Sequence, residues 1–219
     1  MWATERKNHW EKIYSTKLLK EVSWFQPVPE ISLQLIQETN PSAKSKIIDV
    51  GGGDSLLVDH LLELGFSDIT VLDISEKAIL RAKERLGEKE KKINWVVHDV
   101  VSFQSAEKYD VWHDRATFHF LTREEEISSY LKLLDLYLKP NGILIVGTFS
   151  EKGPKKCSGI DIKSYSQEEM INTFSEKFQK IKCLNTDHLT PSQATQNFTF
   201  CMFRKIGNGD EFGSTISSS

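Results

Sequence analysis

The feature that most constrains this chain is a glycine triplet between two short apolar segments, each of which ends near an acid. Residues 47–55 read IIDVGGGDS and residues 70–73 read TVLD; Gly53 and Asp73 are 20 positions apart, enough for one turn, one helix and one strand. This layout is typical of a nucleotide-type cofactor site at the carboxyl ends of two adjacent parallel strands. Glycine lets the backbone pass close to a ligand, and a carboxylate ending the second strand can accept hydrogen bonds from ribose hydroxyls.

The acids around the triplet indicate which cofactor the loop binds. A dinucleotide site needs a third glycine, and this chain has Leu56 at that position. Asp49 and Asp54 would repel a pyrophosphate, whereas they would attract an ammonium group. S-Adenosylmethionine carries an ammonium, a sulfonium and a ribose diol and has no phosphate. The charges therefore favour this cofactor over NAD.

On these residues, the segment resembles motif I of the class I, Rossmann-like S-adenosylmethionine-dependent methyltransferases. The resemblance implies that Asp49 lies near the methionine end of the cofactor and that Asp73 holds the ribose. It also implies that Gly51, Gly53 and Ile74 belong to the cofactor site. The implied activity is transfer of the cofactor's methyl group, and the implied fold is a three-layer α/β sandwich.

A third landmark of that family is an acid after the third strand. A buried strand is predicted over residues 93–97, and Asp99 and Val100 follow it. The resemblance implies that Asp99 accepts a hydrogen bond from the adenine amino group and that Val100 offers its backbone N–H to the ring. The residues alone leave another interpretation open, in which Asp99 caps a short turn.

Three polar residues, His113, Asp114 and Arg115, follow the fourth predicted strand and are the candidate catalytic residues. In the resembling family the end of this strand faces the methyl group and the acceptor, and His113 is also expected to contact the cofactor. His113 could orient or deprotonate a nucleophile because its unperturbed pKa lies near neutrality. Asp114 and Arg115 could instead form an ion pair that shapes the loop. His119 and Phe120 are expected to pack beneath it.

Aromatic residues gather near the N-terminus. Trp10 and Tyr14 are four residues apart and therefore share a helix face, and Trp24 follows them. Such a pair is typical of core packing. In relatives of the family, however, an N-terminal W-x-x-x-Y helix and a W-F segment fold over the cofactor. We therefore expect residues 1–28 to form a lid, with Trp10, Tyr14 and Trp24 in the cofactor site.

The same N-terminal pairing occurs in the elongation-factor and citrate-synthase lysine methyltransferases and in uncharacterised bacterial methyltransferases, so the chain is similar to that group. The lysine enzymes have an acid-lysine-glycine-threonine-like run after the fourth strand, whereas residues 113–118 here read HDRATF. We therefore expect methyl transfer to an N, O or S atom of a small-molecule acceptor, and Arg115 could pair with an anionic one. The alternatives are a protein lysine as acceptor, or a non-catalytic cofactor-binding module that regulates a partner.

Composition argues against several other classes. The net charge is −3 with 27% charged residues, so no globally basic surface invites nucleic acid. Cys157, Cys183 and Cys201 are odd in number and lack C-x-x-C spacing. This argues for a reducing compartment and against zinc or a disulfide framework. The histidines show no metal-ligand spacing, so we expect no metal. With no signal peptide and no membrane-length apolar run, we expect a cytoplasmic monomer or homodimer.

Strands and helices are predicted to alternate along the chain, as in an α/β fold with a mostly parallel sheet. The strands are expected over residues 46–50, 69–73, 93–97, 109–112 and 143–148, and the helices over 4–15, 29–38, 56–64, 75–86 and 122–138, with capping boxes at Thr122 and at Ser166, which opens a last helix. Residues 140–142 are expected as a turn. Residues 178–184 and 198–204 are predicted to add an antiparallel hairpin, which gives seven strands. One domain over residues 1–206 is expected, with 207–219 a disordered tail or an artificial extension.

Overall fold

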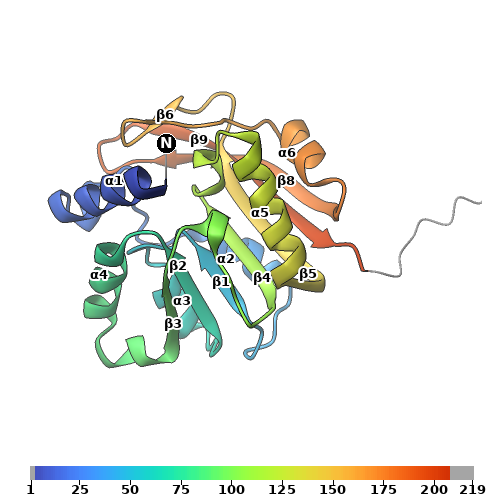
Figure 1. Ribbon diagram of the computed structural model, residues 1–219. Helices are drawn as coiled ribbons and strands as arrows, with labels where there is room; N and C mark the ends of the chain where they lie inside the picture. The colour runs from blue at the N-terminus through green and yellow to red at the C-terminus, as the bar shows by residue number, and fades with distance from the viewer. Residues whose placement is uncertain (1–2, 208–219) are drawn as a thin grey trace, which may run out of the picture.

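The computed structural model describes residues 3–207, which form a seven-stranded sheet in the order β3-β2-β1-β4-β5-β9-β8 (Figure 1). Strands β1 to β5 pair in parallel, whereas β9 pairs antiparallel with both β5 and β8. The predicted fold class, an α/β sandwich whose mostly parallel sheet ends in an antiparallel hairpin, is therefore confirmed. The strands are β1 (Ile47–Val50), β2 (Ile69–Asp73), β3 (Ile93–Val97), β4 (Tyr109–Arg115), β5 (Leu138–Phe149), β8 (Phe178–Leu189) and β9 (Thr195–Lys205).

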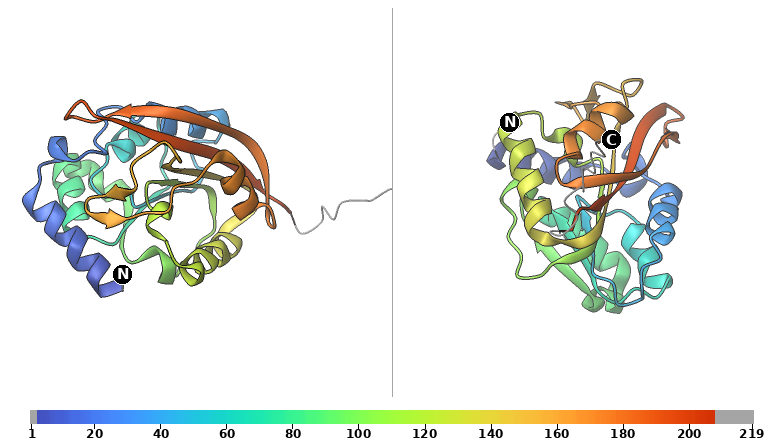
Figure 2. Two further views of the ribbon diagram at one scale, coloured as in Figure 1. Left: turned by 90° about the horizontal axis from the view of Figure 1, so that it is seen from above. Right: turned by 90° about the vertical axis from the view of Figure 1, so that its right-hand side faces the viewer.

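Helices cover both faces of the sheet, which makes three layers (Figure 2). Helices α2, α3 and α4 pack on one face, α5 and α6 pack on the other, and α1 crosses the carboxyl edge of the parallel strands. The helices are α1 (Ala3–Thr16), α2 (Glu30–Glu38), α3 (Leu57–Glu63), α4 (Glu76–Leu86), α5 (Glu124–Tyr137) and α6 (Gln167–Phe174). A small hairpin that the sequence analysis missed, β6 (Lys156–Cys157) with β7 (Ile160–Asp161), lies between β5 and α6.

The alternation of side chains along the strands decides which residues reach which face. In β1, Ile47 packs with apolar residues of α2 and α3, whereas Ile48 packs with apolar residues of α5. In β4, Val111 and Trp112 divide between the same two cores. Because successive side chains of a strand point to opposite faces, Asp49 is directed toward the α2 side.

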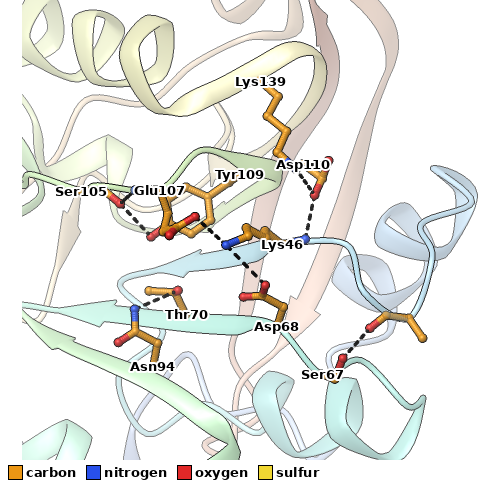
Figure 3. Close-up of polar contacts among 11 residues, drawn as sticks. Lys46, Ser67, Asp68, Thr70, Asn94, Ser105, Glu107, Tyr109, Asp110 and Lys139 are labelled. Carbon is orange, nitrogen blue, oxygen red and sulfur yellow. Dashed lines mark hydrogen bonds and ion pairs between the residues drawn. The ribbon is translucent and has the colours of Figure 1, made fainter.

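Ion pairs join the strand starts at the amino edge of the parallel sheet (Figure 3). Lys46, which directly precedes β1, pairs with Asp68 at 3.6 Å and with Glu107 at 2.5 Å. Its backbone N–H donates to Asp110, whose carboxylate also contacts Lys139 Nζ at 2.8 Å. Exposed pairs of this kind contribute little free energy. The cavity of the molecule lies at the opposite, carboxyl edge.

The helix caps confirm the sequence analysis at two starts and correct it at a third. Ser75 caps α4, and Ser166 opens α6 with the expected capping box. The capping box predicted at Thr122 is wrong, because Arg123 holds the N-cap position of α5 and makes no side-chain cap hydrogen bond. Three glutamates in the first turn of α5 instead complement the positive end of the helix dipole.

Four strands are longer than the sequence predicts: β4, β5, β8 and β9. Strand β4 continues through Arg115 rather than ending at Trp112, because it stays paired with β5 as far as Gly147. Strands β8 and β9 extend toward their shared turn, where the sequence predicts a long connection. His188 therefore lies within β8 and not in a loop, and its imidazole Nε2 contacts the carbonyl oxygen of Ser23 at 2.7 Å.

The start of β5 also differs from the prediction. Helix α5 ends at Tyr137 and β5 begins at Leu138, so residues 140–142, predicted as a turn, belong to the strand. A register shift opposite them, between Tyr109 and Val111 of β4, absorbs the extra length as a bulge would.

Cys183 and Cys201 form a disulfide between β8 and β9. They are partners in the register of this hairpin, and their Cα atoms lie 4.2 Å apart. The prediction of no disulfide is therefore wrong. The two residues are 18 positions apart in the chain, and the pairing of long strands, which their spacing does not reveal, brings them together. Cys157 is free and buried.

The tail predicted over residues 207–219 lies, from position 208 on, outside the described residues. The lid predicted over residues 1–28 is described from residue 3. None of the helices within residues 3–207 combines the length and the apolar character that a membrane crossing requires.

The disulfide predicts a thiol count. Denatured protein purified without reductant should titrate one thiol, and the same protein after reduction should titrate all three of its cysteines. Because the bond closes a loop of 18 residues, reduction should lower the free energy of unfolding by ~3 kcal/mol. The variant Cys157→Ser should show the same loss on reduction. Three titratable thiols before reduction would contradict the pairing.

Candidate functional site

A cavity of about 1080 Å³, open mouth included, lies at the carboxyl edge of the sheet. The strand order reverses between β1 and β4, and open α/β sheets bind ligands at such a point. Of the predicted site residues, Gly53 and Asp114 do not line this cavity. The others do: Trp10, Tyr14, Trp24, Asp49, Gly51, Asp73, Ile74, Asp99, Val100, His113 and Arg115.

The glycine loop is shaped by close approach. Gly51 has φ +67°, and a Cβ there would lie 1.7 Å from Thr117 Oγ1, which donates a hydrogen bond to the carbonyl of Val50. Gly53 has φ +50°, and a Cβ there would lie 2.7 Å from the hydroxyl oxygen of Tyr14. Only glycine combines this backbone conformation with such small clearances. The loop therefore fits against both the segment after β4 and the N-terminal helix.

A buried hydrogen-bonded chain links three elements below this loop. Asp49 and His113 are register partners on β1 and β4, and His113 Nδ1 lies 2.7 Å from Asp49 Oδ1. On its other side, His113 Nε2 lies 2.9 Å from Ser32 Oγ of α2. A neutral imidazole satisfies both contacts, since Nδ1–H donates to the carboxylate and Nε2 accepts from the hydroxyl. Both ring nitrogens are thus occupied, and the chain fixes the orientation of Asp49.

Asp114 points away from its neighbours in the sequence. Because β4 continues to Arg115, the side chains of residues 113 and 115 lie on one face and that of Asp114 on the other. The Asp114 carboxylate accepts hydrogen bonds from the backbone N–H groups of Thr117 and Phe118 and from the hydroxyl of Tyr130 at 2.7 Å. The expectation that residues 113–115 share one site is corrected for Asp114, which holds the segment after β4 in place from beneath.

Asp73, the last residue of β2, is the least compensated carboxylate of the cavity. It is 7% exposed, and Oδ1 accepts one hydrogen bond, from the backbone N–H of Ser75 at 2.7 Å. Burial raises its pKa to about 7, and the nearby negative charges of Asp54, Asp49 and Glu11 act in the same direction. A carboxylate held in this way gains from any ligand that donates hydrogen bonds to it.

Asp99 has partners from two elements. It caps a turn by accepting from the Val101 N–H at 3.2 Å, as one of the two interpretations from sequence predicts. It also pairs with Arg6 of α1 at 3.4 Å, and the same guanidinium contacts Glu126 of α5. Arg6 thereby ties the N-terminal helix to the far side of the cavity. The role of Asp99 toward an adenine stays a prediction.

Aromatic side chains form the roof of the cavity. The ring of Trp10 lies 5.8 Å from that of Trp24, 6.2 Å from that of Tyr14 and 5.1 Å from that of Phe120, centroid to centroid. The expectation that Phe120 packs only beneath the loop is corrected, because this side chain lines the cavity. The contacts of Trp10 with Trp24 and Phe120 are edge-to-face and that with Tyr14 is tilted, and together they hold these rings as one apolar cluster.

Charged contacts anchor α1 on α4 beside this roof. The carboxylate of Glu11 accepts hydrogen bonds from the backbone N–H of Glu76 at 2.7 Å and from the hydroxyl of Ser75. This is the positive end of α4, where a negative charge is favourable. Arg81 of α4 in turn donates to the carbonyl oxygen of Lys17 at 2.8 Å. Helix α1 is therefore held on α4 by reciprocal contacts at helix ends.

The end of the cavity nearest β4, β5 and β9 is more apolar than the end with the carboxylates and contains a cation. Phe149, Phe198 and Cys157 contribute largely apolar wall here, and Arg115 lies among them. Burial raises the pKa of the Cys157 thiol to about 11, so the thiol is protonated at neutral pH. The two ends of the cavity thus differ in charge, with carboxylates at the ends of β1 and β2 and a guanidinium at the end of β4.

Among the residues in or beside this site that the sequence analysis missed are Arg6, Glu11, Ser32 and Thr117. A lone serine in an amphipathic helix and charged residues on an N-terminal helix carry no motif of their own. Thr117 was part of the quoted segment after β4, but only the structure shows that it fills the space that Gly51 leaves.

Comparison with known proteins finds a family match over the first part of the sheet. Residues 48–144 match the family model described as "Methyltransferase domain". The chain is 31% identical to a malonyl-[acyl-carrier protein] O-methyltransferase of Ilyobacter polytropus over 106 residues, which are 48% of this chain and 39% of that protein. It is 25% identical to EEF1A lysine methyltransferase 2 of Danio rerio over 206 residues, 87% of this chain and 82% of that protein.

Solved structures share the fold over nearly the whole chain. The N-methyltransferase NodS of Bradyrhizobium japonicum, crystallised with S-adenosyl-L-homocysteine, superposes with a TM-score of 0.67 over 89% of this chain and 97% of that chain, at 18% identity. At this identity the likeness concerns the fold. It extends the match beyond residue 144, into the antiparallel end of the sheet.

The raised pKa of Asp73 predicts how the ligand-free protein responds to pH. The folded protein binds this proton more tightly than the unfolded chain does, since the pKa rises from 3.8 to about 7 on folding. Ionisation of Asp73 therefore lowers the free energy of unfolding as pH rises from 4 to 7. Asp73→Asn cannot ionise, so its stability relative to wild type should grow across this window, by up to ~4 kcal/mol.

Urea unfolding of both proteins at pH 5 and pH 8 measures this difference directly. Asp161→Asn, a change at an exposed position, serves as the control and should show no growing gap. An equal gap between Asp73→Asn and wild type at the two pH values would contradict the shift.

Proposed function

We propose that this chain is a class I, Rossmann-like S-adenosylmethionine-dependent methyltransferase, similar to the group that includes the elongation-factor lysine methyltransferases, and that it methylates an N, O or S atom of a small-molecule acceptor. The observation that carries the proposal is the uncompensated carboxylate of Asp73 beside a glycine loop in a covered cavity. The chain spans about two fifths of the Ilyobacter relative and four fifths of the zebrafish one. The relatives act on different acceptors, so the acceptor is argued from the site.

The residues at the ends of β1 to β3 suit an adenosyl cofactor. Asp73 has one donor within the protein, which leaves it able to accept from ribose hydroxyls. Asp49 is directed by His113 and carries the negative charge that an α-ammonium group needs. Gly51 has no room for a Cβ. We assign the adenine end to Asp99 and Val100 and the cover to Trp10, Tyr14 and Trp24.

When bound, S-adenosylmethionine supplies a methyl group activated by a positively charged sulfur. The chain's residues then have to bind, orient and exclude water. Trp10, Trp24 and Phe120 form an apolar cover, and orientation of two reactants can lower the barrier by roughly 7–11 kcal/mol. In the transfer, the nucleophile's electron pair forms the new bond to carbon and the pair of the broken bond stays on sulfur. Any proton on the nucleophile must leave to a base or to water.

We assign His113 to positioning. Its two ring nitrogens are engaged by Asp49 and Ser32, so it offers no free lone pair toward the cavity in this arrangement. Holding the Asp49 carboxylate in a fixed direction stabilises a cation at that place. Ser32, His113 and Asp49 form a hydrogen-bonded chain like that of a catalytic triad, but the function proposed here needs no such triad.

The charge at the acceptor end supports a small molecule over a protein lysine. Arg115 lies there, and a guanidinium repels the ammonium group of a lysine side chain. The lid and Phe120 also cover the cavity, which leaves less access for a protein loop. The lysine methyltransferase remains the second candidate, because the zebrafish relative is matched over most of both chains.

Methyl transfer from labelled cofactor tests the proposal. Purified protein with S-adenosyl-L-[methyl-³H]methionine should label compounds in the small-molecule fraction of a cell extract and leave the protein fraction unlabelled. Asp73→Asn should lose at least about 90% of this activity at subsaturating cofactor, because each ribose hydrogen bond to a charged acceptor is worth roughly 1.5–3 kcal/mol. Asp161→Asn, at an exposed position, should retain it. Label in the protein fraction alone would contradict the proposal that the acceptor is a small molecule. Label in neither fraction, although the cofactor binds, would contradict the proposed methyltransferase activity.

A further inference from the structure

Arg115 is a buried cation with incomplete partners. Its Nη1 donates to the carbonyl oxygen of Trp24 at 3.1 Å, and its Cζ lies 5.2 Å from the ring centroid of Phe198. Its Nη2 is buried and has no hydrogen-bond partner among the residues that the structure describes. The ion pairs found within residues 3–207 do not include Arg115.

This arrangement costs free energy unless a ligand accepts from the free donor. A buried donor without an acceptor loses its hydration and gains nothing in return. Burial lowers the pKa of Arg115 to about 10, and the group is still charged at neutral pH. Asp49 interacts with it electrostatically, but one oxygen of Asp49 is engaged by His113. The guanidinium therefore has the charge and a free donor to bind an anion.

The position of Arg115 separates it from the residues assigned to the adenosyl group. Asp73 ends β2 and Asp99 follows β3, on one side of the point where the strand order reverses. Arg115 ends β4, and its wall is completed by Phe149 at the end of β5 and by Phe198 of β9. This side of the cavity combines one cation with aromatic walls. It suits a molecule that has an apolar body and an anionic group.

We propose that the methyl acceptor carries a carboxylate and that Arg115 Nη2 binds it, an inference that rests on the methyltransferase function proposed above. A planar guanidinium matches a planar carboxylate better than an ammonium would. Arg115 is then a specificity-determining residue. It selects acceptors with an anion at a fixed distance from the nucleophile and rejects the side chain of lysine.

A carboxylate could also come from the amino-acid end of the cofactor. Asp49 and Arg115 interact electrostatically, so a zwitterion could contact both. This second source is distinguished by experiment, because decarboxylated S-adenosylmethionine keeps the ammonium and lacks the carboxylate.

Calorimetry provides the test. Wild type, Arg115→Gln and Arg115→Lys are first titrated with S-adenosylhomocysteine. Each is then saturated with it and titrated with benzoate, phenylacetate and 3-phenylpropionate, each compared with its neutral amide. The control is Arg204→Gln, which removes an exposed arginine of β9. Urea unfolding confirms that the variants are folded, and the lysine variant keeps the charge should the glutamine variant be unstable.

We expect wild type to bind at least one of these carboxylates about tenfold or more tightly than its amide. Arg115→Gln should abolish the preference, Arg115→Lys should retain part of it and Arg204→Gln should retain all of it. The affinity for S-adenosylhomocysteine should change less than about twofold in every variant.

Two results would overturn the inference alone. One is the absence of any preference for a carboxylate in wild type that binds S-adenosylhomocysteine. The other is a loss of tenfold or more in S-adenosylhomocysteine affinity in Arg115→Gln, with decarboxylated S-adenosylmethionine bound equally by variant and wild type. The carboxylate would then be the cofactor's own. Failure of wild type to bind S-adenosylhomocysteine would instead overturn the proposed function.

Discussion

Two carboxylates, Asp49 and Asp73, end neighbouring strands in one desolvated cavity, and the rest of the site is arranged around their charge. Asp49 is compensated within the protein, because His113 donates to it and Ser32 completes the chain. Asp73 is not, and burial raises its pKa to about 7. The charge of Asp49 is thus compensated by a side chain of the fold, whereas Asp73 has only the backbone N–H of Ser75 and gains further stabilisation from a ligand that donates to it. A buried carboxylate whose ionised form is disfavoured in this way is typical of a binding site.

The attachment of α1 follows from the same electrostatics. Glu11 adds a further negative charge near Asp73, yet it binds the positive end of α4 and so attaches α1 over the cavity. Arg6 does the same at the other end by joining α1 to Asp99 and α5. The negative charge of the cavity is therefore confined to the side of β1 to β3. The cation Arg115 lies on the side of β4, so the two sides of the cavity differ in charge.

Local patterns predicted much of this, and long-range geometry limited the rest. The glycine triplet and its acids identified β1, β2 and the cavity. A close approach of the backbone requires glycine, and the acids lie next to the strand ends, so both features can be read from short segments of the sequence. No short segment of the sequence identifies Ser32, because its contact with His113 arises only where α2 packs against β4. Asp114 was grouped with His113 because the length of β4 was underestimated. Both residues belong to β4, and successive side chains of a strand point to opposite faces, so Asp114 lies on the opposite face from His113. The pairing of Cys183 with Cys201 was missed for the related reason that two strands were longer than expected.

The most direct test of the central claim is the proton balance of cofactor binding. If ribose hydroxyls bind the ionised form of Asp73, binding must release the proton that this group carries in the empty protein. Calorimetric titration of S-adenosylhomocysteine in buffers of different ionisation enthalpy should then show release approaching one proton at pH 6 and almost none at pH 8. No proton release at pH 6, or an undiminished release in Asp73→Asn, would contradict the account.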